Sequence, residues 1–235
     1  MKRITLFVAL FITTGLFAQK RIVWFDAGLK VQYGASGFYS GAIEKATGYN
    51  HELSYSSGFG YGGKLGINWQ YNGLSLEAFY NKSRQDVEVT NAGEPSYSYE
   101  WKAMDFYALY RNAKNLGYFE LGPKVSLLRQ MDKIQGNTAS DVKSNFNNTN
   151  FAGVLGFGAN ILGNDGRFSG ILGLRFEYGF TDIVKTGATG HPLPAGVAER
   201  KPTNPYFAGL VFEFNWGIGY FGKAQCGARS KFIMF

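Results

Sequence analysis

The stretch YFAGLVFEFNWGIGY, residues 206–220, alternates apolar and polar positions along its length. Its even-numbered residues are aromatic or aliphatic, whereas its odd-numbered residues include Glu213, Asn215 and three glycines. A period of two predicts a β-strand with two different faces. This apolar face is too long and too aromatic for a surface strand of a soluble domain. It therefore predicts a strand that shows its apolar side to lipid, as in a membrane barrel.

Seven further stretches have the same alternation. They predict an all-β protein, an eight-stranded antiparallel transmembrane up-and-down β-barrel. The expected strands cover residues 22–33, 59–71, 74–89, 97–110, 117–131, 150–162, 168–184 and 205–221. A soluble β-sandwich is the alternative, since each strand signal of a membrane barrel is weak.

The connections between these strands are alternately long and short. Asn72-Gly73 is a strong hairpin signal, because both residues tolerate positive φ. The segments 112–116 and 163–167 are also short, and 163–167 contains Asn-Asp-Gly. The longer, more polar connections are 34–58, 90–96, 132–149 and 185–204. Outer-membrane barrels have short periplasmic turns and longer extracellular loops, so the pattern places both chain ends on the periplasmic side.

The expected outward face carries no charge, as the cost of placing Arg or Lys against lipid requires. Its members in the other strands are Val23, Phe25, Leu29, Val31, Leu65, Ile67, Trp69, Leu76, Phe106, Tyr110, Phe119, Leu121, Val125, Phe157, Ile161, Leu172, Leu174 and Phe176. Amphipathic rings near the short turns predict a periplasmic aromatic girdle. The girdle residues are Trp69, Tyr71, Tyr110 and Tyr220.

The expected inward face carries ten charged residues. They are Asp26, Lys30, Lys64, Glu77, Asp105, Glu120, Lys124, Arg175, Glu177 and Glu213. An eight-stranded barrel is just wide enough for side chains to fill it, so these residues predict a structural salt-bridge network that plugs the lumen. The alternative is a path for protons or ions. Inward glycines leave room for the long charged side chains: Gly28, Gly60, Gly62, Gly66, Gly122, Gly156, Gly158 and Gly173.

The N-terminus has the three parts of a secretory signal. Lys2 and Arg3 precede the apolar run 4–17, and cleavage is expected before Gln19. An uncleaved membrane anchor is the alternative. Export places the mature protein in the outer membrane of a Gram-negative bacterium, with a signal peptide at 1–18, a barrel domain at 19–221 and a periplasmic tail at 222–235. That tail is either a handle for a partner or an extension without a role.

Composition and motifs exclude several classes of function. The formal charge is +7, but the basic residues are scattered, which excludes nucleic acid and suits contact with anionic lipid. Cys226 is the only cysteine, so there is no disulfide framework, although an intermolecular disulfide stays open. The glycine patterns 58–63 and 217–222 lie in expected strands without a following helix, so they predict no dinucleotide site. We expect no cofactor and no metal.

We also expect no enzymatic activity. Small outer-membrane barrels with a His-based site at the outer rim exist, and this chain has two histidines, His51 and His191, in its first and last long loops. Partners for such a site would come from Ser54, Ser56, Asp86 or Glu199. No tight His–Ser–acid spacing connects them, and assignment of a catalytic site requires geometry.

The second half of the chain resembles the PorT-like and OmpX-like small outer-membrane barrels of Bacteroidetes-type bacteria. The resemblance lies in the segments 104–110, 118–125, 153–159 and 174–183, which include YFELGPKV and LRFEYGFTDI. This family pattern has Y-x-E-x-G-P in one strand and x-R-Y-x-x-G-L-T-N-I in a later one, and this chain has Phe and Asp variants of the second. One departure is that residues 222–235 follow Tyr220-Phe221, which look like the aromatic end of the last strand.

The resemblance implies an accessory or structural subunit of an outer-membrane protein complex. The expected partners are outer-membrane lipid and a larger outer-membrane protein complex, for which the resemblance suggests the type IX secretion apparatus. Two alternatives stay open. One is a narrow channel for ions or small solutes, and the other is a lipid-modifying enzyme.

Overall fold

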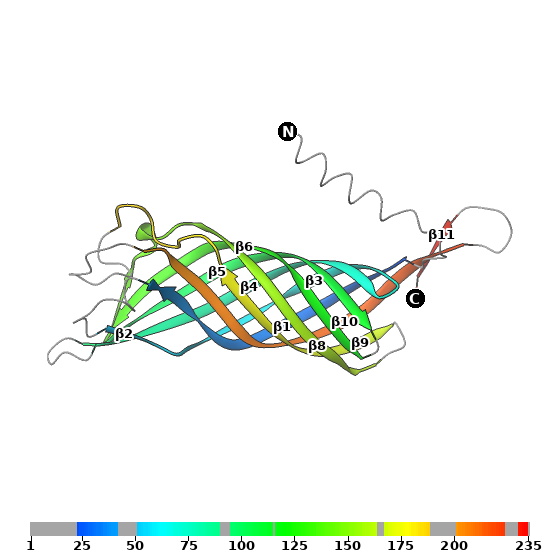
Figure 1. Ribbon diagram of the computed structural model, residues 1–235, viewed down its shortest axis with the longest axis horizontal. Helices are drawn as coiled ribbons and strands as arrows, with labels where there is room; N and C mark the ends of the chain where they lie inside the picture. Colours follow the sequence, from blue (N-terminus) through cyan, green and yellow to red (C-terminus); the bar gives the residue numbers. More distant parts are fainter. Residues whose placement is uncertain are drawn as a thin grey trace, which may run out of the picture.

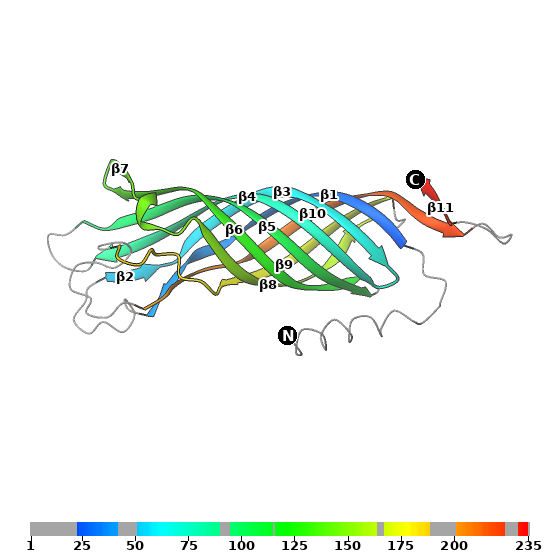
Figure 2. The same cartoon turned by 90° about the horizontal axis from the view of Figure 1, so that it is seen from above.

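A computed structural model describes residues 23–41, 51–89, 95–114, 116–163, 167–188, 201–223 and 230–234. Eight long strands form a closed antiparallel ring, seen from two directions in Figures 1 and 2. The ring strands are β1 (Val23–Ser40), β3 (Ser56–Trp69), β4 (Asn72–Val89), β5 (Tyr97–Lys114), β6 (Gly117–Gln135), β8 (Thr149–Leu162), β9 (Phe168–Gly179) and β10 (Thr203–Lys223).

Each ring strand pairs with the next along the chain, and β1 closes the ring by pairing with β10. Val23 lies opposite Trp69 of β3 on one side and Phe221 of β10 on the other. The predicted all-β, eight-stranded up-and-down barrel is confirmed. The two glycine patterns lie inside β3 and β10, as expected.

Shorter elements extend the two ends of the ring. At one end are β2 (His51–Ser54), which pairs with β4, and β7 (Thr138–Asp141), which pairs with β6. The 3-10 helix η1 (Lys143–Asn145) follows β7 in the same connection. Figure 2 shows β2 and β7 at the end opposite β11 (Ser230–Met234), and Figure 1 shows β2 at that same end. We call the end that carries β2 and β7 the loop end of the barrel, and the end that carries β11 the turn end.

The outside of the barrel carries large apolar side chains on all eight ring strands. Examples, one per strand, are Leu29, Leu65, Leu76, Phe106, Leu121, Phe157, Leu174 and Leu210, which are all exposed. A soluble monomer rarely exposes an apolar patch beyond a few hundred Å². A band that surrounds the molecule needs lipid as its solvent. The protein is a transmembrane β-barrel.

The strands are longer than a membrane requires. A spanning strand needs about 9–11 residues, whereas β4 and β5 have 18 each. Since the short turns fix one end near the membrane surface, the surplus length extends the barrel beyond the membrane at the loop end. No helix within the described ranges has both the length and the apolar character to cross a membrane.

Several strand ends differ from the predictions. The first strand, expected to end at residue 33, continues to Ser40, and the fifth, expected to end at 131, continues to Gln135. The seventh strand, expected to reach residue 184, ends at Gly179, because amide side chains take the carbonyls that a longer strand would use. Asn204 Nδ2 donates to the Gly179 carbonyl and Asn150 Nδ2 to the Thr181 carbonyl, both at 2.8 Å. The chain then turns across the loop end, where Val184 forms a bridge with Phe146. The fourth strand, expected to end at 110, continues to Lys114.

The tail boundary expected at residue 221 also differs. The strand β10 continues to Lys223, and Gly219–Lys223 pair with Ser230–Met234 of β11. The edge rings Phe25, Phe221 and Phe232 pack against one another, with centroids 5.3–5.9 Å apart. Part of the predicted tail is therefore a strand attached to the barrel wall.

Inward glycines make space for polar side chains, as predicted. A Cβ at Gly60 would lie 1.7 Å from Asn81 Oδ1, and one at Gly156 would lie 2.7 Å from Glu120 Cγ. Real Cβ atoms do not approach this closely, so larger residues would displace the polar side chains of the lumen.

Candidate functional site

The lumen is the candidate site, because all ten predicted lumen charges lie inside the barrel wall and take part in ion pairs. Together with Arg111, which was not among the ten, they separate into two groups along the barrel axis. The turn-side charge layer holds eight residues: Asp26, Lys30, Lys64, Glu77, Arg111, Glu120, Arg175 and Glu213. The loop-side charge cluster holds three: Asp105, Lys124 and Glu177.

Glu213 is the centre of the turn-side layer. Its carboxylate accepts from Lys64 Nζ at 2.7 Å and from Arg111 Nη1 and Nη2 at 2.8 and 2.7 Å. Lys30 Nζ lies 3.0 Å from the same carboxylate and also donates to Glu77. Three cations from β1, β3 and β5 therefore converge on one side chain of β10. Such charge-assisted bonds are the strong class of hydrogen bond.

Arg175 connects opposite walls of the barrel. Its Nη2 donates to Glu77 of β4 at 2.9 Å and to Glu120 of β6 at 2.8 Å, and the side chain is fully buried. Its Nε and Nη1 have no hydrogen-bond partner among the described residues. The guanidinium instead lies 4.9 Å from the centroid of the Tyr107 ring and 5.6 Å from that of Phe79. Ring faces attract a cation, which offsets part of the cost of the unused donors.

Sequence reasoning missed Arg111. It is 8% exposed and its Nη2 donates to Glu120 Oε2 at 2.6 Å, so it is a full member of the turn-side layer. The expected strand ended at residue 110 and the expected turn began at 112, so Arg111 lay outside every predicted strand. Alternation could have found it, because it has the same parity as Asp105 and Tyr107, which also face inward.

The loop-side cluster has a single cation between two carboxylates. Lys124 Nζ lies 2.6 Å from Asp105 Oδ2 and 2.6 Å from Glu177 Oε2. Tyr107 Oη donates to Glu177 Oε1 at 3.0 Å, and Asn81 Nδ2 donates to Asp105 Oδ2 at 2.6 Å.

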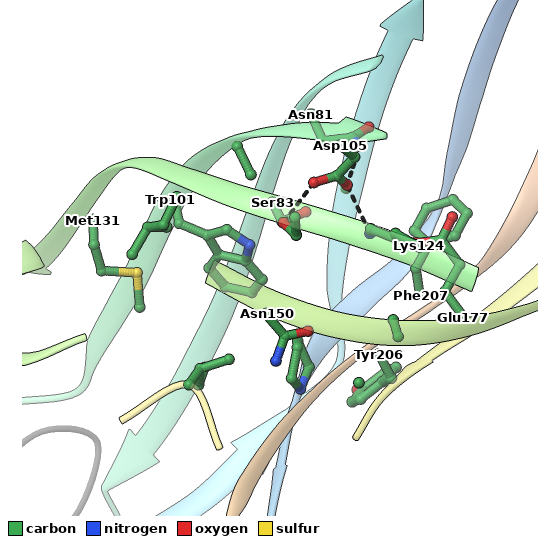
Figure 3. A pocket seen from close by; sticks show the side chains of 18 of the residues that line it. Asn81, Ser83, Trp101, Asp105, Lys124, Met131, Asn150, Glu177, Tyr206 and Phe207 are labelled. Carbon is green, nitrogen blue, oxygen red and sulfur yellow. Dashed lines mark hydrogen bonds and ion pairs between the residues drawn. The ribbon is translucent and has the colours of Figure 1, made fainter. Parts of the chain in front are cut away.

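A cavity of about 80 Å³ lies on the loop side of this cluster (Figure 3). Asp105, Lys124 and Glu177 line one part of it, and Trp101, Met131 and Phe146 line another. Side chains of opposite character therefore share one cavity.

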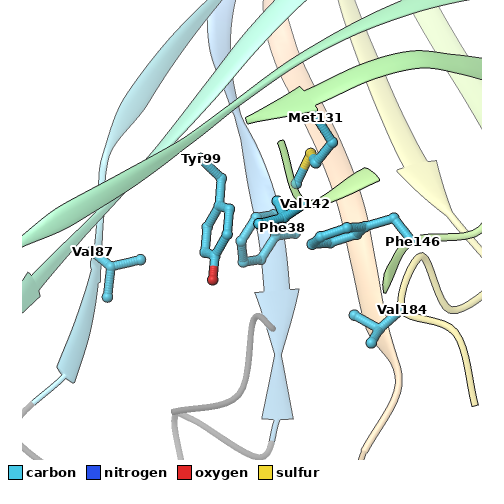
Figure 4. Close-up of a cluster of buried hydrophobic side chains, with 7 residues drawn as sticks. All are labelled: Phe38, Val87, Tyr99, Met131, Val142, Phe146 and Val184. Atoms are coloured by element: carbon cyan, nitrogen blue, oxygen red, sulfur yellow. The ribbon is translucent and has the colours of Figure 1, made fainter. Parts of the chain in front are cut away.

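An apolar cap covers the loop end of the lumen (Figure 4). It consists of Phe38, Val87, Tyr99, Met131, Val142, Phe146 and Val184, which come from β1, β4, β5, β6 and the two connections after β6 and β9. Burial raises the pKa of Tyr99 well above its ordinary value, so its phenol stays neutral in this cluster. The 132–149 connection is thus folded onto the barrel mouth.

The structure places the four predicted girdle residues at the turn end. Trp69 pairs with Asn72 in the β3–β4 hairpin, and Tyr71 lies in the turn itself. Tyr110 lies opposite Leu74 and donates its hydroxyl hydrogen to Asn72 Oδ1. Tyr220 lies opposite Trp24, close to the end of β10. Their role as an interfacial girdle stays a prediction.

Of the residues considered for a catalytic site, Ser56 and Asp86 come together. Ser56 Oγ donates to Asp86 Oδ2 at 3.1 Å and accepts from the Asp86 amide at 2.8 Å. Ser54 lies opposite Asp86 in the β2–β4 pairing, and the backbone of His51 lies opposite Val89. The Ser56–Asp86 pair connects β3 to β4 where β2 ends. Glu199 and His191 lie outside the described residues, as do Cys226 and the predicted signal peptide at 1–18.

No protein-family model and no curated protein matches the chain. Membership of the PorT-like family therefore stays a prediction.

Several solved structures resemble the chain, among them the following three. Neisserial surface protein A (NspA) is 12% identical, with 80% of this chain and 95% of that one covered and a TM-score of 0.39. The outer membrane protein OprG from Pseudomonas aeruginosa is 13% identical, with 85% and 96% covered and a TM-score of 0.40. The translocator domain of autotransporter NalP from Neisseria meningitidis is 11% identical, with 92% and 95% covered and a TM-score of 0.31. The barrel assignment rests on the strand pairing and the lipid-facing surface described above.

Proposed function

We propose that this protein is a non-enzymatic barrel of the Gram-negative outer membrane that serves as an accessory or structural subunit of a larger protein complex. The observation that carries the proposal is β11. It extends the barrel wall at the turn end, and in the described part of the chain it pairs with β10 alone. Its other edge is available to a strand of a partner.

An edge strand presents a row of backbone donors and acceptors, which another chain can use by strand addition. The side chains of Phe232, Ile233 and Met234 are exposed on this element. If the tail is periplasmic, as the topology predicts, the partner is a periplasmic protein or the periplasmic part of a membrane complex.

The closed lumen favours a structural role over transport. Ion pairs connect non-adjacent strands, such as β9 to β4 through Arg175 and Glu77 and β5 to β10 through Arg111 and Glu213. These bonds cross the interior, and the apolar cap covers the loop end. A steady water-filled path would have to break several buried ion pairs.

The role of β11 can be tested by isolating the barrel from native outer membranes. A copy with an affinity tag in the 185–202 connection is extracted in mild detergent, and co-purifying proteins are identified by mass spectrometry. We expect stoichiometric recovery of a partner with the native chain. Replacement of residues 230–234 by Gly and Ser should abolish this recovery, because it removes the edge strand and its apolar side chains.

The matched control is Tyr55→Ser, which changes an exposed ring at the opposite end of the barrel. The control should retain the partner, and both variants should keep the heat-modifiable migration of a folded barrel. Recovery of the barrel alone from native membranes would contradict the proposal. A narrower role in type IX secretion rests on the sequence resemblance, and recovery of a secretion complex would support it.

Planar-bilayer recording distinguishes the structural role from a narrow channel. We expect the native protein to show no steady conductance, since the turn-side layer fills the lumen. Channels of constant amplitude in the native protein would contradict this. Protease protection of the protein in vesicles of the same lipid verifies its insertion independently.

A further inference from the structure

We propose that the cavity at the loop-side charge cluster binds a small organic cation, a primary ammonium group carried on an apolar body. The proposal stands on the charge of the cavity, on an unused buried acceptor and on the apolar wall opposite them.

The first observation is the charge of the lumen. Among the described residues, its ion pairs contain six carboxylates and five cations, so one carboxylate is in excess. The turn-side layer holds four of each sign and is balanced. The excess lies in the loop-side cluster, where Asp105 and Glu177 share Lys124. A buried charge without a counter-charge is costly, so this cluster favours a bound cation.

The second observation is an acceptor without a donor. A carboxylate only accepts, so Asn81 must direct its Nδ2 to Asp105 and its Oδ1 away. That oxygen accepts from Gln32 Nε2 at 3.0 Å, which fixes the orientation of the Gln32 amide. Gln32 lines the cavity, is 3% exposed, and its Oε1 has no hydrogen-bond partner within the described ranges. A ligand with N–H donors would satisfy it.

The third observation is the character of the opposite wall. Figure 3 shows Trp101 and Met131 on the same cavity as Asp105 and Lys124. Phe146 and Leu128 also line it. An aromatic and thioether wall favours the apolar body of an organic cation. A bare metal ion would instead prefer several oxygen ligands. Among the aromatic residues, Trp attracts a cation most strongly through its ring face.

The cavity volume limits the size of the ligand. A cavity needs about 10–15 Å³ to hold a single water, so this cavity of about 80 Å³ holds several waters or a compact organic molecule. An ammonium group would replace those waters at Gln32 and the carboxylates, and a ring or short alkyl chain would contact the apolar wall.

Isothermal titration of the refolded full-length chain in detergent tests this assignment. The probes are 2-phenylethylammonium, its neutral analogue 2-phenylethanol, the anion 3-phenylpropionate, and methylammonium, which lacks the apolar body. We expect saturable binding of 2-phenylethylammonium, at least about tenfold weaker binding of methylammonium and no specific binding of the other two. Empty micelles provide the correction for partitioning.

Two variants test the named groups. Asp105→Asn removes the excess charge and Gln32→Met removes the unused acceptor, and each should weaken binding of 2-phenylethylammonium about tenfold or more. The control is Glu100→Gln, which removes one carboxylate from an ion pair at the outer rim and should leave binding unchanged. Heat-modifiable migration verifies that each variant is folded, and Gln32→Met keeps every ion pair if Asp105→Asn does not fold.

Several results would overturn the proposal. Equal binding of the ammonium and the alcohol would show that charge plays no part. Equal binding of methylammonium, or full displacement by sodium, would show a site for a simple cation instead. Unchanged affinity in both Asp105→Asn and Gln32→Met would show that binding occurs elsewhere.

Discussion

Replacement of Glu213 by Gln is expected to destabilise the folded barrel by about 3–5 kcal/mol. Gln has nearly the same shape but leaves Lys30, Lys64 and Arg111 without the carboxylate on which they converge. Removing one partner of a buried ion pair costs more than the pair contributes, because the remaining charges cannot regain water. The measurement is the urea midpoint of the protein in lipid vesicles, followed by tryptophan fluorescence and by heat-modifiable migration.

The matched control for this variant is Glu100→Gln. Glu100 pairs with Lys82 at 3.0 Å and Arg84 at 3.4 Å, but those cations are about half exposed, so the loss should not exceed about 1 kcal/mol. The double variant Glu213→Gln, Lys64→Met should be more stable than Glu213→Gln. Without the Glu213 charge the turn-side layer has four cations and three carboxylates, and loss of Lys64 removes the excess cation. A midpoint shift for Glu213→Gln no larger than that of the control would show that the layer is not the main support of the fold.

Replacement of Leu174 by Arg is expected to cost about 2–4 kcal/mol in a bilayer. Leu174 lies near the middle of β9, opposite Leu210 of β10 and Phe157 of β8, and it is exposed on the outside of the barrel. A guanidinium at this depth meets hydrocarbon instead of water. The free energy of unfolding from vesicles, or the yield of folded barrel during refolding into them, measures the effect.

The control is Tyr55→Arg. Tyr55 is 76% exposed and lies between β2 and β3 at the loop end, beyond the length of strand that a membrane needs. Its replacement should change stability by no more than about 0.5 kcal/mol. Equal losses of stability for both variants would show that the membrane boundary assigned here is incorrect. Equal stability of Leu174→Arg and the native chain would contradict a lipid-facing wall.

The two predictions act on opposite faces of the same strands. Leu174 faces lipid, while its neighbour Arg175 is fully buried among the lumen carboxylates. Period-two alternation is a local property of an extended backbone, so each assignment was accessible from the sequence. The absence of Arg111 from the predicted lumen charges shows the limit of this approach, because alternation assigns a residue to a face only within the predicted strand.

Strand ends were decided by contacts distant in the chain. The end of β9 depends on the side chains of Asn150 and Asn204, which reach the carbonyls of residues 181 and 179. Likewise, β11 follows the last ring strand in the chain and folds back to pair with β10, whereas the sequence pattern indicated only a tail there. Neither contact leaves a periodic signal.

Local alternation was enough to predict the ring of eight strands, the face on which side chains lie within the expected strands, and the alternation of short turns and long connections. The tertiary structure alone decided which charges meet, where the excess carboxylate lies and which loops cover the lumen. The physical reason is that strand stagger and tilt set which residues of non-adjacent strands share one height in a barrel. Arg175 meets Glu77 and Glu120 across the lumen, and no local pattern in the chain encodes that height.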